Sequence, residues 1–300
     1  ALAIVVALLL APILSGWVNM CRAWLQNRSA PSLWQPYRTL HKLFVKESVV
    51  AEHASPIFRS APYIVFGCML VACAIVPTLS TDLPMSTAAD AIALVGLLAL
   101  ARVFVSLAAM DVGTAFGTLG ARREMLVGFL AEPALLMVLF SASLISKSTS
   151  LTTMVELLAH RELAIHPVLA FAGVAFTMVS LAENARVPVD NPATHLELTM
   201  IHEVMVLDHS GPELSAMQYA AAIKMTMYAG LIAALLNPFD VFAAPLPAIA
   251  ATLAIMAAVA VAVGCVESLT ARLRMRLVPG YLALATALAA LGLLAAASLA

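Results

Sequence analysis

The densest run of ionisable residues in this chain lies between Phe176 and Gly211. A predicted helix reaches Glu183, two prolines follow, and six acidic or imidazole residues then occur within fifteen positions. These six are His195, Glu197, His202, Glu203, Asp208 and His209. Only 11% of the chain is charged, so the density is unusual. Carboxylate and imidazole groups within hydrogen-bond reach of one another, directly or through water, can pass a proton along.

Further ionisable residues lie inside segments that are otherwise apolar. Glu132 is followed by Pro133 in one such segment, and Lys224 and Arg102 lie in two others. An ionisable group at bilayer depth is costly and by default indicates an ion or proton path. Two alternatives stay open. Glu132 can form a structural ion pair with Lys224 or Arg102, and Arg102 can instead extend its charge to the membrane surface.

We therefore predict a proton or ion pathway through these groups. Glu183 and Arg186 are three residues apart, so they would share a face in a helix and form a pair. His209 and Glu213, taken alone, are more typical of a solvated loop. The predicted pathway residues are Glu132, Glu183, Arg186, Asp190, His195, Glu197, Glu203, Asp208 and Lys224.

The segments that position these groups are apolar enough to span a membrane. Hydrophobic residues make up 63% of the 300 residues, and the mean hydropathy is +0.99. Apolar runs of about 20 residues predict about eight spanning helices. These are Ala1–Met20, Ala61–Leu79, Ala88–Met110, Met125–Ile145, Leu163–Ala182, Met217–Leu236, Leu246–Val266 and Pro279–Ala300. The predicted fold is an all-α polytopic transmembrane helical bundle, a single integral membrane domain over residues 1–300.

The basic residues predict the orientation of the bundle. Twelve of the sixteen Lys and Arg residues lie in the loops after the odd-numbered spans, and only Lys147 and Arg161 lie in the others. The positive-inside rule places the first group of loops in the cytoplasm, at about residues 21–60, 111–124, 184–216 and 267–278. We expect an inner-membrane protein with both termini outside. The first apolar run lacks a basic region before it, so we interpret it as a retained helix.

Composition also excludes several function classes. The net charge of −1 provides no field that would attract nucleic acid. The four cysteines form no CxxC pair, and cysteine in an apolar run usually packs as a small hydrophobe. We therefore predict no metal site in this chain.

Two of the predicted cytoplasmic loops suit a surface role. The basic and aromatic residues of Leu25–Glu47 are typical of a helix on a membrane surface or of a partner-docking face. In Ala109–Pro133, Gly113, Gly117 and Gly120 would allow close backbone approach within a loop.

These three segments together resemble the subunit 1 family of respiratory complex I, which includes the matching membrane subunits of formate hydrogenlyase and hydrogenase-4. The first segment carries the family's Gln–x–Arg, Gln–Pro and Lys–Leu–x–x–Lys–Glu elements at Gln26, Arg28, Gln35, Pro36 and Lys42–Glu47. The second carries Asp111, Gly117, Gly120, Ala121 and Arg123. The third carries Glu183, Arg186, Pro188, Asp190 and Glu197, then Asp208, His209, Ser210 and Gly211.

The end of the chain looks more like the hydrogenase branch, the group 4 membrane-bound nickel–iron hydrogenases, because of the Glu–Ser–x–x–Ala–Arg–x–Arg run at Glu267–Arg274. The sequence also departs from the family pattern. Ala193 and His195 replace expected acids, and Asp208–His209 replaces an acidic–tyrosine pair. A quinone pocket of the usual kind is therefore less expected than a proton route assisted by imidazole.

The resemblance implies a non-catalytic membrane-arm subunit of an oxidoreductase complex. It would anchor hydrogenase or dehydrogenase large and small subunits on the cytoplasmic side and pass the redox signal to antiporter-like membrane subunits as proton or Na⁺ movement. It implies no cofactor in this chain. It implies iron–sulfur clusters in the partners, together with a nickel–iron centre where the partner is a hydrogenase. The implied docking residues are Gln26, Arg28, Gln35, Arg38, Lys42, Asp111, Arg122 and Arg123.

Three alternatives remain. Within the same family, the chain could be a quinone-reactive subunit of a respiratory dehydrogenase. A stand-alone secondary transporter is a different class, and it is disfavoured because the chain has no visible internal repeat. A passive membrane anchor would have no need to bury Glu132 or Lys224.

Overall fold

The computed structural model describes residues 2–78, 90–159, 167–191, 200–237, 239 and 245–299. These residues form eleven α-helices and a short 3-10 turn, and no strand is assigned among them. The helices are α1 (Leu2–Leu25), α2 (Gln35–Val45), α3 (Pro56–Ile75), α4 (Ala91–Asp111), α5 (Ala115–Ser146), α6 (Leu151–Ala159), α7 (Pro167–Glu183), α8 (His202–Val206), α9 (Gly211–Leu236), α10 (Pro245–Leu269) and α11 (Val278–Leu299). The predicted all-α bundle is confirmed.

Seven helices in the described part of the chain are long and apolar enough to cross a membrane, namely α1, α3, α4, α5, α9, α10 and α11. A shorter apolar helix, Ala170–Glu183 within α7, lies where the fifth span is predicted. The structure thus has a helix at each of the eight predicted places. Residues 160–166, which include the predicted start of the fifth span, lie outside the described residues.

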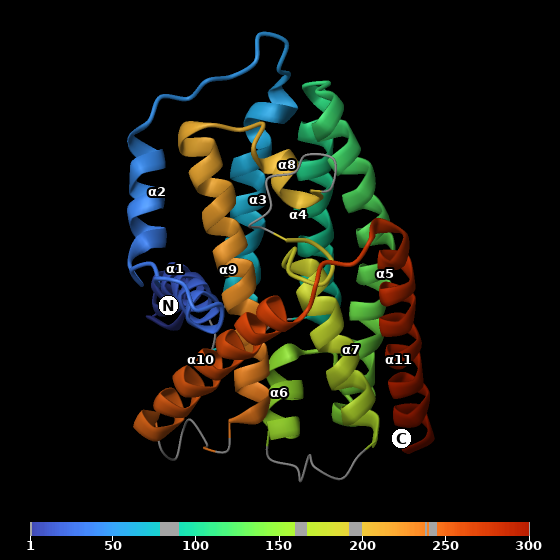
Figure 1. The fold of residues 1–300 in the computed structure, drawn as a ribbon. Helices are drawn as coiled ribbons and strands as arrows, with labels where there is room; N and C mark the ends of the chain where they lie inside the picture. The colour runs from blue at the N-terminus through green and yellow to red at the C-terminus, as the bar shows by residue number, and fades with distance from the viewer. Residues whose placement is uncertain are drawn as a thin grey trace.

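The central helices α3, α4, α5 and α9 run side by side, with α7 and α11 packed on α5 (Figure 1). On the other side, α1 and α10 pack against α9 and against each other, and Figure 1 shows α10 crossing the bundle obliquely. Many buried positions hold alanine, including Ala101, Ala108, Ala131 and Ala134. Small residues let helix backbones approach closely, which is how helices associate in a bilayer without a hydrophobic driving force between them.

One predicted loop is wrong. Residues 111–124 are mostly helical, because α5 begins at Ala115, ten residues before the predicted start at Met125, and only Val112–Thr114 separates it from α4. The Thr114 side chain caps α5 by accepting a hydrogen bond from the Gly117 amide at 3.2 Å. Gly117 and Gly120 are therefore helical residues rather than loop residues. Their lack of a side chain makes room for Asp208 and Val204 against α5.

The remaining predicted loops contain more helix than expected. The first, residues 21–60, includes the end of α1, all of α2 and the start of α3. The start of α9 lies within the predicted loop 184–216, and α10 continues to Leu269. Three of these loop regions and the α4–α5 junction meet at one end of the bundle: the Ser55 amide donates to Asp111 at 2.8 Å, the Val49 amide donates to Ser210 at 2.7 Å, and Arg272 pairs with Asp190 at 3.2 Å.

Cysteine labelling tests the predicted orientation. His53 in the first loop region and Thr149 between α5 and α6 are both exposed, and they belong to opposite ends of the alternating spans. In sealed right-side-out vesicles, and with the native cysteines replaced, we expect a membrane-impermeant maleimide to label Thr149→Cys but not His53→Cys. Disruption of the vesicles with detergent should then expose His53→Cys. Labelling of His53→Cys alone in sealed vesicles would reverse the orientation.

Candidate functional site

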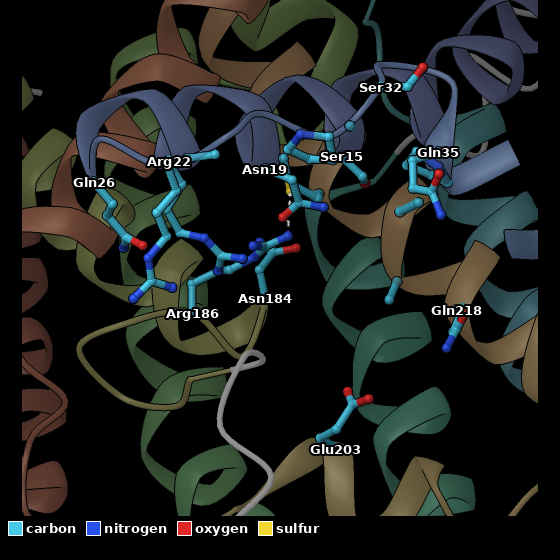
Figure 2. A pocket seen from close by; sticks show the side chains of 18 of the residues that line it. Ser15, Asn19, Arg22, Gln26, Ser32, Gln35, Asn184, Arg186, Glu203 and Gln218 are labelled. Carbon is cyan, nitrogen blue, oxygen red and sulfur yellow. Dashed lines mark hydrogen bonds between the residues drawn. The ribbon is translucent and has the colours of Figure 1, made fainter. Parts of the chain in front are cut away.

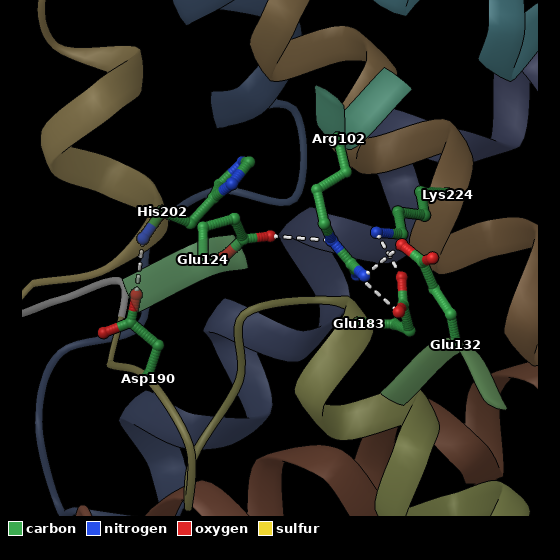
Figure 3. A network of polar contacts seen from close by, with 7 residues as sticks. All are labelled: Arg102, Glu124, Glu132, Glu183, Asp190, His202 and Lys224. Atoms are coloured by element: carbon green, nitrogen blue, oxygen red, sulfur yellow. Dashed lines mark hydrogen bonds and ion pairs between the residues drawn. The ribbon is translucent and has the colours of Figure 1, made fainter. Parts of the chain in front are cut away.

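The side chain of Arg102 lies at the centre of a buried group of charges. Arg102, on α4, is 8% exposed and donates hydrogen bonds to three carboxylates. Its Nε lies 3.2 Å from Glu124 Oε1, its Nη1 lies 2.8 Å from Glu132 Oε1, and its Nη2 is bonded to Glu183 Oε1 (Figure 3). Arg102 therefore does not extend to the membrane surface, and the prediction that it could supply the cation for Glu132 is confirmed.

The spacing of residues on α5 makes room for this guanidinium. Glu124, Gly128 and Glu132 are each four residues apart, so they lie along one face of the helix. A Cβ atom at Gly128 would come within 2.5 Å of Arg102 Nη1 and 2.7 Å of its Cδ. Because Gly128 has no side chain, the Arg102 side chain can lie against α5 between the carboxylates of Glu124 and Glu132.

Two more helices complete the group. Glu183, the last residue of α7, is 5% exposed, and its Oε2 lies 2.8 Å from Nζ of Lys224 on α9. We call Arg102, Glu124, Glu132, Glu183 and Lys224 the Arg102 cluster. It joins α4, α5, α7 and α9, and it contains three carboxylates and two cations. With all five groups ionised its charge is −1, which one proton or one monovalent cation would balance.

The predicted pair between Glu183 and Arg186 is wrong. Ala185 adopts a left-handed conformation with φ of 49° just after α7 ends, so Arg186 does not continue the helical face of Glu183. Arg186 Nη1 instead lies 2.9 Å from Glu267 Oε1 on α10. The other oxygen of Glu267 lies 3.4 Å from Arg22 Nη1, at the end of α1. Glu267 therefore ties the end of α1 and the loop after α7 to α10.

Asp190 organises the loop that follows. Its carboxylate accepts a hydrogen bond from the backbone amide of His202 at 3.0 Å (Figure 3). It also accepts one from the amide of Ile201 at 3.2 Å and pairs with Arg272. Arg123 donates to the Met200 carbonyl at 3.0 Å. These contacts join Asp190 and Arg123 to the segment that begins at Met200. The predicted pathway groups His195 and Glu197 lie outside the described residues.

The Arg102 cluster lines one cavity, and a larger cavity shares part of that cavity's wall. The larger, about 600 Å³, is lined by polar residues of α1, the α1–α2 connection, α9 and the loop after α7, and it includes Arg186, Asn184 and Glu203 (Figure 2). The smaller, about 70 Å³, is lined by Arg102, Glu124, Glu183, His202 and Lys224, among others. Asn184 and Ala221 line both. Since a water needs about 10–15 Å³ of such volume, the smaller cavity has room for several waters beside the carboxylates.

The turn at residues 207–211 packs against the starts of α3 and α5. Asp208 lies 3.2 Å from the hydroxyl of Thr114 at the start of α5, about three helical turns before Glu124, and burial raises the pKa of Asp208. His209 stacks on Phe58 with ring centroids 4.1 Å apart, and burial lowers its pKa to about 4. His209 is therefore a neutral, packed imidazole and not part of a solvated loop.

The predicted docking residues separate into three groups. Gln26, Arg28 and Gln35 line the larger cavity. Arg38, Lys42 and Arg122 are exposed. Asp111 and Arg123 bond inward to Ser55 and Met200, so they hold the fold together at this end.

Sequence reasoning missed part of the site. The predicted pathway does not include Arg102, Glu124 or Glu267, and the sequence assigns no ion-pair partner to Arg22 or Arg272. The spacing of Glu124, Gly128 and Glu132 was a usable signal for one acidic face, but no local pattern reveals a pair such as Arg22 with Glu267, which are 245 residues apart. Among the described residues, no group of three or more His, Cys, Asp or Glu residues is placed to hold a metal ion.

Comparison with known proteins was made for the sequence and for the fold. A family model described as NADH dehydrogenase matches residues 1–297. Hydrogenase-4 component C of Escherichia coli (strain K12) is 32% identical over 236 residues, 78% of this chain and 73% of the relative. Formate hydrogenlyase subunit 4 of the same organism is 29% identical over 274 residues, 90% of this chain and 88% of the relative.

A solved structure has the same fold. The membrane-bound sulfane sulfur reductase, an archaeal respiratory membrane complex, contains a chain that superposes with a TM-score of 0.85 at 20% sequence identity. The superposition covers 98% of this chain and 97% of that one.

A methyl group at position 128 tests the geometry of the Arg102 cluster. We expect Gly128→Ala to lower thermal stability in detergent by about 1–3 kcal/mol, because the added Cβ overlaps the Arg102 guanidinium. Gly96→Ala on α4 is the matched control, since a Cβ there meets nothing within 4 Å. The control should be neutral or slightly stabilising, as alanine favours a helix over glycine. Equal stability of the two variants would contradict the assigned position of Arg102.

Proposed function

Because the chain belongs to the NADH dehydrogenase family, we propose that it is a membrane-arm subunit of a complex I-like or hydrogenase-4-like complex. In this role it anchors the soluble redox arm on the cytoplasmic side and couples electron transfer to translocation of protons or Na⁺. It is not itself the catalytic subunit. The iron–sulfur clusters and a nickel–iron centre would belong to the large and small subunits of the soluble arm, and antiporter-like membrane subunits would receive the coupling signal.

The observation that carries this proposal is the Arg102 cluster with its surplus carboxylate. A cluster that served stability alone would gain from balanced charges or from apolar groups of equal volume, because each acid at the bilayer centre costs about 2.5–3.5 kcal/mol on insertion scales. Three carboxylates around two cations instead leave a place for one proton or monovalent cation. Loss and recovery of that charge is the elementary step that coupling requires.

The two cavities supply a route from the cytoplasmic end to the cluster. Glu203 lines the larger cavity, and Asn184 connects its wall to the smaller one, where His202 faces the same space as Glu124 and Glu183. The side chain of Glu132 is 29% exposed, whereas that of Glu183 is 1% exposed. A charge that enters by the cavities and reaches Glu183 therefore leaves the chain at Glu132, where a neighbouring membrane subunit would take it up.

The loop after α7 is the element that would transmit the redox signal. Arg186 and Asp190 fasten it to Glu267 and Arg272 at the end of α10, and Glu183 lies only three residues before Arg186. A soluble partner docked on the same end of the bundle would shift this loop when its redox state changes. Displacement of Arg186 or Asn184 would change the field at Glu183 and hence its hold on the proton or cation.

Substitution of Glu132 separates a relay from a structural ion pair. Arg102 keeps Glu124 and Glu183 as partners in Glu132→Gln, so we expect the complex to stay assembled. Cation translocation per electron, measured for the reconstituted complex in sealed vesicles, should fall about tenfold or more, because an amide cannot exchange a proton as a carboxylate does. Glu52→Gln, at an exposed position in the first loop region, is the control. Unchanged translocation in an intact Glu132→Gln complex would remove Glu132 from the pathway.

Charge reversal on α2 tests the anchoring role. Arg38 and Lys42 lie four residues apart on α2, and both are exposed. We expect the double variant Arg38→Glu/Lys42→Glu to lose the soluble subunits on affinity purification while the membrane chain stays inserted. Lys147→Glu, exposed on the opposite side of the spans, should keep them. Retention of the soluble arm by the double variant would place the docking surface elsewhere.

A further inference from the structure

The larger cavity is rich in guanidinium groups. Arg22 comes from α1, Arg28 from the connection to α2, and Arg186 from the loop after α7, and all three line the same space. Figure 2 shows Arg22 and Arg186 side by side on one wall and Glu203, the only acidic residue among the described residues of the lining, apart from them. The cavity therefore has an excess of positive charge at one end.

Most of the hydrogen-bonding capacity of these guanidinium groups is free. Glu267, which lies outside the cavity wall, accepts one contact from Nη1 of Arg22 and one from Nη1 of Arg186. A guanidinium has five N–H donors. Within the part of the chain that the structure describes, the side chain of Arg28 makes no ion pair or hydrogen bond. Among the described residues, three cations therefore line the cavity against one acid in the lining, Glu203, and one behind it, Glu267. The cations outnumber the acids, so an anion is the complementary ligand.

Neutral donors surround the same space. Asn19, Gln26, Gln35 and Gln218 line the cavity, and their side-chain amides make no hydrogen bond to any other residue that the structure describes. Guanidinium groups bind phosphate oxygens in pairs, and amides can donate to the remaining oxygens. This set of donors fits a phosphate group better than a neutral polar ring, which would leave the charge of Arg28 unbalanced.

The tryptophans place the mouth of the cavity at the level of lipid headgroups. The chain has three tryptophans, and all of them flank cavity-lining residues: Trp17 and Trp24 on α1, and Trp34 before α2. Trp24 and Trp34 are 55% and 54% exposed, Trp17 stacks edge-on with Trp24 at 5.9 Å, and Trp34 lies 5.7 Å from Tyr37. Trp and Tyr side chains concentrate at membrane–water interfaces.

We propose that this cavity binds the phosphate headgroup of an anionic phospholipid, held by Arg28 together with Arg22 and Arg186. A basic pocket between membrane helices on the cytoplasmic side is a typical headgroup site. The bound headgroup would lie at the end of the cavity that holds Arg22 and Arg186, apart from Glu203, and would brace the loop that carries Arg186. This site does not depend on the direction or identity of the translocated ion.

Native mass spectrometry of the purified full-length chain tests the site. The probes are phosphatidylglycerol and phosphatidylcholine with identical acyl chains, so only the headgroup charge differs. We expect phosphatidylglycerol to bind preferentially, and Arg28→Gln to weaken its binding about tenfold, since a charge-assisted hydrogen bond is worth about 1.5–3 kcal/mol. Arg28→Lys, which keeps the charge but loses the two-pronged contact, should have an intermediate effect.

The control is Arg59→Gln, an exposed arginine on α3 that does not line the cavity. It should bind phosphatidylglycerol as the unchanged chain does. Equal binding of the two lipids, or equal loss in Arg59→Gln and Arg28→Gln, would overturn the proposal. Displacement of the lipid by inorganic phosphate at millimolar concentration would assign the site to free phosphate instead. Displacement by a short-chain quinone would assign it to a neutral redox carrier.

Discussion

A guanidinium group buried among membrane-spanning helices has to be paired, and the arrangement of the central helices follows from how Arg102 meets this requirement. Its three nitrogens contact carboxylates from α5 and α7, and one of these carboxylates also holds Lys224 of α9. Removal of one partner from a buried ion pair leaves a charge that typically costs about 3–5 kcal/mol. Four helices are therefore fixed in rotation and depth by one set of charges, because any sliding would separate groups that the bilayer cannot solvate.

This constraint also explains the small residues around the cluster. Gly128 admits the Arg102 side chain, and Ala101, Ala131 and Ala134 are buried on the two helices that flank it. Larger side chains there would push α4 and α5 apart and lengthen the ion pairs. The close packing of α4 on α5 and the ion pairs of Arg102 therefore depend on each other.

A second set of charges holds the end of the bundle where the first loop region and the loops after α7 and α10 meet. Glu267 joins Arg22 of α1 to Arg186, and Asp190 joins the same loop to Arg272. The loop from Glu183 to Asp190 therefore begins in the buried cluster and ends in a contact with Arg272, just after α10. Both sets of charges include residues of this short segment. A displacement of the loop at Asp190 is therefore transmitted to Glu183 over only a few residues. The proposed headgroup site borders the segment at Arg186 and would set how freely it moves.

The sequence by itself determined that the chain lies in a membrane and which ionisable residues its apolar segments contain. Composition and run length required a bilayer and about eight spans, and the asymmetry of Lys and Arg predicted the orientation. The isolated charges of Glu132 and Lys224 predicted that their helices have a function besides packing. These features depend on single residues or short windows, which is why they are readable without a fold.

Only the tertiary structure decided which charges meet. Glu183 was expected to pair with Arg186 three residues away, yet it pairs with Arg102, 81 residues away, because the left-handed turn at Ala185 redirects the chain. The same holds for the start of α5, where the Thr114 cap and the fit of Gly117 and Gly120 against the segment at residues 201–208 convert a predicted loop into helix. A pair between distant segments is set by how helices cross, and that depends on the packing of the whole bundle.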